Sequence, residues 1–91
     1  MNTKTISQQE LLKILNNNET IFNNLKQYLQ DIENIQLIIN DNVIDSFNLK
    51  IKEKQYIKKY EVNNLIIKIY DFSNYLIIIE KNSYKYFIIS I

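Results

Sequence analysis

The sequence has no cysteine, no histidine, no glycine and no arginine. Without cysteine and histidine the chain cannot build a disulfide, a thiolate or imidazole metal site, or a Ser-His or Cys-His catalytic pair. Without glycine it cannot form the phosphate-binding loops of Walker or dinucleotide-binding proteins. Without arginine it lacks the bidentate side chain that binds carboxylate and phosphate groups. We therefore predict a protein that is not an enzyme and that holds no cofactor or metal ion.

Long apolar segments are also missing. Residues 1–8 contain no apolar core of the kind that a signal peptide needs. No uncharged apolar run approaches the roughly 18–20 residues of a membrane-spanning helix. We therefore expect a protein of the cytoplasm, in a bacterium or in a host cell, without a membrane partner. With 91 residues the chain has room for one hydrophobic core, so we predict a single domain over residues 1–91.

Tryptophan, proline and alanine are absent too, and a few residue types dominate instead. Isoleucine, asparagine, lysine, tyrosine and phenylalanine together supply 55 of the 91 residues. AT-rich codons encode all five of them. We interpret this composition as that of an AT-rich genome, belonging to a bacterium or to one of its mobile elements. The missing arginine is accordingly attributed to base composition and not to function.

The clearest local signal predicts a helix that begins at Ser7. The Ser7 hydroxyl can accept the backbone N–H of Glu10 while the Glu10 carboxylate accepts that of Ser7, which is a capping box. Residues 16–18 are three asparagines, which suit helix caps better than helix interiors. We favour two helices within about residues 7–32. A single continuous helix with a heptad seam through the asparagines is the alternative.

From residue 35 onward apolar side chains alternate with polar ones, which indicates β-strands over about residues 35–91. One of these strands is expected over residues 43–51. Polar breaks that are typical of turns separate the strands, at residues 40–42, 53–56, 63–64, 72–74 and 82–83. The sequence thus predicts an α+β fold, in which two N-terminal helices pack on one face of an antiparallel meander sheet of five or six strands.

The last hairpin can be aligned by its charges. A tight turn at residues 82–83 places Glu80 opposite Lys85, and such opposite-charge pairs support a register. The same register forms two further pairs, Ile78 with Phe87 and Leu76 with Ile89. Both faces of the hairpin are then apolar, and two helices can cover only one face. We predict that Phe87 and Ile89 belong to an interface, formed with a second copy in a homodimer or with another protein.

Charges are unevenly distributed along the chain. Residues 1–45 carry three lysines and six acids, whereas residues 46–91 carry eight lysines and four acids. In the predicted sheet three lysines align across neighbouring strands and two further residues lie beside them: Lys50, Lys59 and Lys68, with Lys52 and Tyr70. We predict that these five residues bind a partner, which could be a protein or a single nucleic-acid strand. A solvated face that protects a sheet edge from aggregation is the alternative.

Two groups of acidic residues are candidate sites for a divalent cation, and the spacing of the residues argues against both. Four acids between residues 31 and 45 lie near the junction of helix and strand, but their spacing matches no cation-binding loop. Asp71 with Glu80 and Lys81 lacks the arrangement of metal-dependent nucleases, because adjacent residues of a strand point to opposite faces.

These observations favour a small non-enzymatic interaction protein that binds a macromolecular protein partner. Its size and its AT-rich composition suit a phage or mobile-element accessory or inhibitor protein that acts on a host enzyme or defence complex. Two alternatives remain open. One is a nucleic-acid-binding module that uses the Lys/Tyr sheet face, and the other is a structural homodimer through the C-terminal hairpin.

Overall fold

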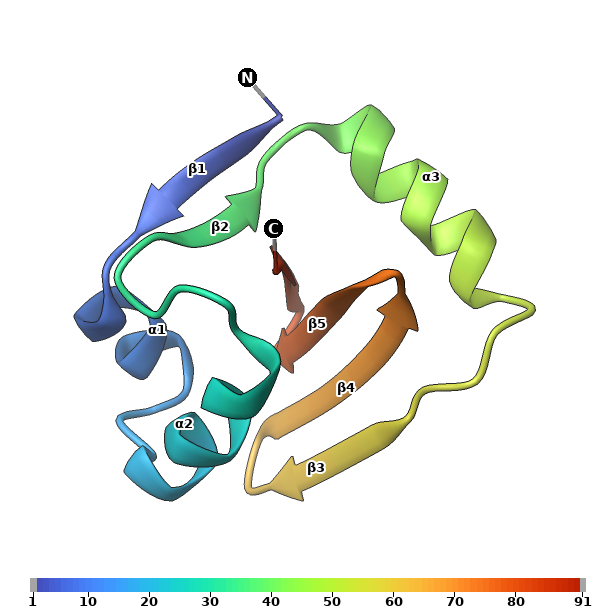
Figure 1. Cartoon of the computed structure of the whole chain (residues 1–91). Helices are drawn as coiled ribbons and strands as arrows, with labels where there is room; N and C mark the ends of the chain where they lie inside the picture. The colour runs from blue at the N-terminus through green and yellow to red at the C-terminus, as the bar shows by residue number, and fades with distance from the viewer. Residues whose placement is uncertain (1, 91) are drawn as a thin grey trace.

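Figure 1 shows a computed structural model of the chain, which describes residues 2–90. Within this range three α-helices and one 3-10 helix accompany a six-stranded antiparallel sheet of order β1-β2-β6-β5-β4-β3. The elements are β1 (Thr3–Ile6), α1 (Gln8–Ile14), α2 (Glu19–Leu25), the 3-10 helix η1 (Lys26–Tyr28), β2 (Ile35–Ile38), α3 (Asp41–Ile51), β3 (Lys58–Val62), β4 (Leu65–Phe72), β5 (Asn74–Lys81) and β6 (Tyr84–Ile89). The predicted α+β class and the antiparallel sheet are confirmed.

The first two helices begin where side chains cap them. The Ser7 hydroxyl accepts the Glu10 N–H at 3.1 Å, and the Glu10 carboxylate accepts the Ser7 N–H at 3.5 Å. The predicted capping box is therefore present. The Asn18 side chain caps α2 by accepting a backbone N–H three residues further on, at 3.0 Å. Between the helices Asn16 and Asn17 have positive φ angles, which ends α1 and gives two helices in place of a continuous one.

The limits of the helical region differ from the prediction. α2 ends at Leu25 and continues only as η1 to Tyr28, so a helical range that reaches residue 32 is too long. Residues Thr3–Ile6 form β1, a strand that the sequence does not predict, which pairs antiparallel with β2. This short segment has too few apolar residues to show a period of two. Its pairing depends on β2, which lies far away in the sequence.

The C-terminal strands pair in the predicted register. The observed pairs include Glu80 with Lys85, Ile78 with Phe87, Leu76 with Ile89, and Lys59 with Lys68. Three turn residues, Asn63, Ser73 and Asn82, have φ angles of 50°, 83° and 56°. Such left-handed conformations usually favour glycine, and asparagine is among the few other residues that tolerate them. Strands β3 to β6 thus form a meander of four strands, fewer than the predicted five or six. β2 pairs with β6, and β1 pairs with β2, so these two strands extend the sheet beyond β6.

One hydrophobic cluster joins α1 and α2 to the sheet. Leu11 of α1, Leu15 at the C-cap of α1 and Phe22 of α2 are buried in it. They pack with alternate residues of the central strands, namely Leu65, Ile67, Ile69, Ile77, Ile79 and Ile88. The alternation follows from the pleat of the sheet, because successive side chains of a strand point to opposite faces.

The opposite face of the sheet packs against α3, where the sequence predicts a strand. Figure 1 shows α1 and α2 on the left and α3 on the upper right. Asn40 caps α3 by accepting two backbone N–H groups of the first turn, at 3.0 and 3.3 Å. The apolar residues that contact the sheet recur at helical spacing, at positions 43, 44, 47 and 51. Leu49, which completes the strand-like alternation, is 66% exposed. The predicted strand over residues 43–51 is therefore wrong.

α3 covers the second apolar face of the C-terminal hairpin. The buried residues of this second cluster are Ile38, Tyr70, Leu76, Ile78 and Phe87. Phe87 is only 2% exposed, and Ile89 is partly buried beside it. An interface at Phe87 and Ile89 is predicted because two helices would leave that face of the sheet uncovered. A third helix of the same chain covers the face, so this reason for an interface is incorrect.

Candidate functional site

The seven residues predicted to bind a partner all belong to the α3 side of the molecule. Lys59, Lys68, Tyr70, Phe87 and Ile89 lie on the strands of that sheet face, and Lys50 and Lys52 lie at the C-terminal end of α3. Lys59 and Lys68 are directly opposite each other, as predicted. Lys50 does not continue their row across the sheet, because its segment is helical.

Aromatic rings connect these two groups of residues. The ring centroids of Phe47 and Phe72 lie 5.8 Å apart, those of Phe72 and Tyr70 lie 6.1 Å apart, and those of Tyr70 and Tyr56 lie 6.4 Å apart. Rings separated by about 4.5–7 Å attract each other beyond the effect of burial. The four rings come from α3, from β4 and from the linker over residues 52–57. They therefore fix the end of α3 and the linker against the sheet.

Lysine side chains lie over three of the four rings. The Lys50 Nζ is 5.5 Å from the centroid of Phe47, the Lys54 Nζ is 4.6 Å from Phe72, and the Lys68 Nζ is 5.6 Å from Tyr56. These distances are typical of cation–π contacts. We name this group the lysine–aromatic corner, which consists of Phe47, Lys50, Lys54, Tyr56, Lys68, Tyr70 and Phe72. It contains three of the predicted site residues.

Lys59 interacts with an acid of its own strand. Its Nζ lies 2.7 Å from Oε1 of Glu61. The hydrogen bond and the charge of Glu61 raise the pKa of Lys59, and the same contact lowers the pKa of Glu61. On the same sheet face the Glu80 carboxylate lies 3.8 Å from the Lys85 Nζ. On the α3 side, strands β3, β5 and β6 therefore carry acids beside their lysines, and the predicted row is reduced to the pair of Lys59 and Lys68.

Tyr70 lies where the lysine–aromatic corner meets the buried cluster, and it is 5% exposed. Burial raises the pKa of its hydroxyl, and the nearby Glu80 carboxylate and Tyr56 raise it further. The phenol consequently stays protonated at neutral pH and is not an activated nucleophile. Its ring serves to join the corner to the core.

Three large apolar side chains in or next to the corner in the sequence are exposed, and Tyr56 is the one that belongs to the corner. Leu49 is 66% exposed, Tyr56 44% and Ile57 52%. They lie at the end of α3 and in the linker, on either side of Lys50, Lys52 and Lys54 in the sequence. Sequence reasoning assigned Leu49 and Ile57 to strands and residues 53–56 to a turn, so it did not single these three residues out as exposed anchors. Apolar residues beside the lysines of positions 50–54 are the sequence signal for this site.

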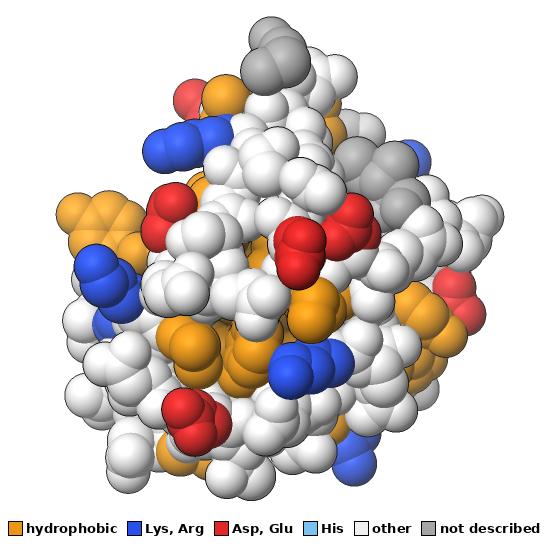
Figure 2. Space-filling model, turned by 60° about the vertical axis from the view of Figure 1, so that its left-hand side comes forward, with side chains coloured by type: hydrophobic (Ala, Val, Ile, Leu, Met, Phe, Trp, Pro, Cys, Tyr) orange, Lys and Arg blue, Asp and Glu red, His pale blue; other side chains and the backbone are white. Residues whose placement is uncertain are grey.

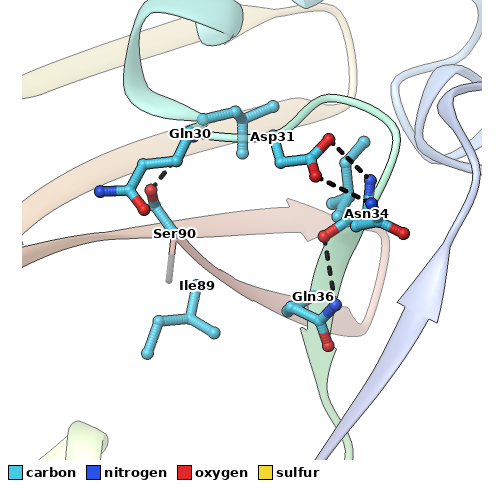
Figure 3. Close-up of a pocket in the computed structure, with 8 residues that line it drawn as sticks. Gln30, Asp31, Asn34, Gln36, Ile89 and Ser90 are labelled. Atoms are coloured by element: carbon cyan, nitrogen blue, oxygen red, sulfur yellow. Dashed lines mark hydrogen bonds between the residues drawn. The ribbon is translucent and has the colours of Figure 1, made fainter.

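A small hollow lined by both polar and apolar side chains lies at the end of β6, as Figure 3 shows. Its volume is about 210 Å³, below the roughly 300–1,000 Å³ of small-molecule sites. The Asp31 carboxylate accepts the Asn34 side-chain amide at 2.8 Å, and this bond, with backbone N–H groups of the same turn, lowers the pKa of Asp31. The Ser90 hydroxyl accepts the Gln30 N–H at 3.3 Å. The polar groups thus bond mainly to one another.

Over residues 2–90 the rest of the surface has a second hollow of about 230 Å³, beside Tyr28 and Tyr75, which is also smaller than small-molecule sites. Figure 2 looks at the side on which α1 and α2 lie, and it shows acidic and basic side chains interspersed among small hydrophobic patches. Within residues 2–90 no three acidic side chains are grouped so that they could hold a metal ion. None of the helices that the structure describes is long and apolar enough to cross a membrane.

Comparisons with family models, with curated proteins and with solved structures gave no match. The lysine–aromatic corner, which includes the exposed Tyr56, and the exposed residues Leu49 and Ile57 are therefore the basis for a function.

Proposed function

We propose that this chain is a small non-enzymatic interaction protein that binds a protein partner at the end of α3. The exposure of Leu49, Tyr56 and Ile57 beside a group of lysines carries this proposal. Apolar and aromatic anchors with a charged rim are the usual arrangement of a protein–protein interface. Side chains of this size, exposed within one short segment, can supply such anchors.

A protein partner fits this surface better than a nucleic-acid strand does. Binding of single strands needs open aromatic faces on which bases can stack. Lysines of the chain itself lie over the rings of Phe47, Phe72 and Tyr56. Lys59, which the predicted nucleic-acid face includes, is paired with Glu61. Few ring faces therefore remain on which bases could stack, and one lysine of the predicted face is already paired.

The composition supports the biological setting of the proposal. An AT-rich codon usage is typical of many mobile elements, and the missing catalytic residue types favour action by binding. The proposed role is that of an accessory or inhibitor protein of a phage or mobile element, which acts on a host enzyme or defence complex.

Affinity capture from the lysate of an AT-rich bacterium tests this proposal. The wild-type chain is expected to recover a stoichiometric protein, and the variant with Leu49→Ser, Tyr56→Ser and Ile57→Ser is expected to lose it. Tyr84→Ser is the matched control, because Tyr84 is 71% exposed on the opposite face of the sheet. Recovery of no protein by the wild type, or of the same protein by the triple variant, would contradict the proposal.

A further inference from the structure

We infer that the partner presents an acidic surface, and that the lysine–aromatic corner binds its carboxylates with lysines that are positioned before binding. This inference rests on the proposed function and goes beyond it by naming the chemistry of the partner. It follows from the charge of the segment, from the contacts that hold the lysines, and from the apolar residues between them.

The charge of the segment is strongly one-sided. Between residues 50 and 68 there are six lysines and two acids, although the whole chain has a net charge of only +1. One of the two acids, Glu61, is already paired with Lys59. Charged groups across a protein interface are arranged so that potentials complement each other. A contact surface that is rich in aspartate and glutamate is therefore the complement of this segment.

The lysines are held by the rings beneath them. A free lysine loses much rotamer freedom when it binds, which reduces the affinity gained from its charge. Lys50, Lys54 and Lys68 each lie over one ring, and the rings contact one another. A ring occupies only one side of an ammonium group, and the other side can still donate to a carboxylate. The corner thus presents three charges in a set arrangement.

The same contact elsewhere in the molecule provides a control. The Lys26 Nζ lies 5.0 Å from the centroid of Phe22 in α2, on the other side of the sheet. Lys26 belongs to residues 1–45, which carry twice as many acids as lysines. A lysine over a ring is therefore not by itself the proposed site. The three lysines of the corner differ in that their rings contact one another in a series, and one of these rings belongs to the exposed Tyr56.

Binding of a short fluorescent peptide of alternating glutamate and leucine tests the inference, with a peptide of alternating lysine and leucine and with oligo-dT as the other probes. The acidic peptide should bind the wild type, and its affinity should fall as salt is added. The variant with Lys50→Gln, Lys54→Gln and Lys68→Gln should lose about tenfold in affinity. Tyr56→Leu should lose about threefold while every charge remains. Lys26→Gln should change the affinity by less than about twofold.

Several results would overturn the inference. These are the absence of binding to the acidic peptide, binding that is insensitive to salt or to the three lysine substitutions, and equal or tighter binding of oligo-dT. Circular dichroism of each variant verifies that it is folded. If the capture experiment finds a protein that depends on Leu49, Tyr56 and Ile57 but not on the lysines, the proposed function stands and the acidic partner is wrong.

Discussion

Lys68 holds its ammonium group 5.6 Å from the centre of the Tyr56 ring, although one residue belongs to β4 and the other to a linker without regular secondary structure. The rings of Tyr56 and Tyr70 lie edge to face, with 88° between the ring planes. Tyr56 therefore helps to attach the exposed linker to the sheet, together with the hydrogen bond from the Ile57 N–H to the Ile69 carbonyl at 2.8 Å.

Tyr56→Leu should destabilise the fold by about 1 kcal/mol, because it removes one cation–π contact and one edge-to-face contact of an exposed residue. Urea unfolding measures this change. Tyr84→Leu is the control, since Tyr84 is the most exposed of the large hydrophobic residues in the described range and should change stability by less than about 0.5 kcal/mol. Equal effects of the two substitutions would show that the Tyr56 contacts add no stability.

Phe87→Ala should cost about 3–4 kcal/mol, because the side chain is buried under α3. Ile89→Ala should cost less, since Ile89 is only partly buried. Urea unfolding gives the free energies and sedimentation gives the mass. A Phe87→Ala protein that keeps its stability but changes its oligomeric state would restore Phe87 as an interface residue.

α3 should open more readily than the central strands. None of its side chains is buried, whereas Leu76, Ile77, Ile78 and Ile79 of β5 are. Local opening is easiest where few apolar groups are buried. Amide hydrogen exchange should therefore be faster in α3, and Asn40→Ala, which removes the cap, should accelerate it through a loss of about 1 kcal/mol. Equal protection of α3 and β5 would contradict this expectation.

Acid should weaken the turn at Asp31. The pKa of Asp31 is lower in the folded chain than in the unfolded one, so its stabilising effect is present above its unfolded value near pH ~4. The effect is lost as the pH falls through the folded value. Unfolding midpoints in urea should therefore differ between the wild type and Asp31→Asn at neutral pH and converge in acid. A difference that does not shrink as the pH falls below the unfolded pKa would mean that the charge is not its cause.

Ser73→Gly should stabilise the chain by about 0.5–1 kcal/mol, because Ser73 has a φ angle of 83° and glycine adopts such angles without a steric cost. The hydrogen bond from the Ser73 N–H to Asp71 uses the backbone and is retained. Asn63→Gly is the comparison and should gain less, since asparagine tolerates a left-handed conformation. Thermal unfolding of the wild type, Ser73→Gly and Asn63→Gly gives the order of their stabilities.

Local signals in the sequence predicted much of the fold. The capping box at Ser7 and the Glu80–Lys85 pair depend on neighbouring residues or on one hairpin, and both are observed. β1 was missed because its partner is remote in the sequence. The segment from Asp41 to Ile51 was misassigned because its apolar residues satisfy both periods, and only the exposure of Leu49 in the folded chain decides between them.

The candidate site was predicted less well than the fold. The lysines at positions 50 and 68 were identified from their charge, and they do lie in the same corner. The arrangement of these lysines was not predicted, because it depends on aromatic rings from α3, β4 and the linker. A contact of β4 with α3 and the linker that follows it leaves no periodic pattern in the sequence. The contacts of Tyr56 could not be predicted for the same reason.

The two hydrophobic clusters lie on opposite faces of one sheet, and no side chain belongs to both of them. Neighbouring residues of β4 and β5 point into different clusters, so a substitution under α3 leaves the packing of α1 and α2 largely unchanged. Evolution can therefore alter the side with the lysine–aromatic corner while the other cluster preserves the fold. A chain under pressure to follow a changing partner would gain from that separation.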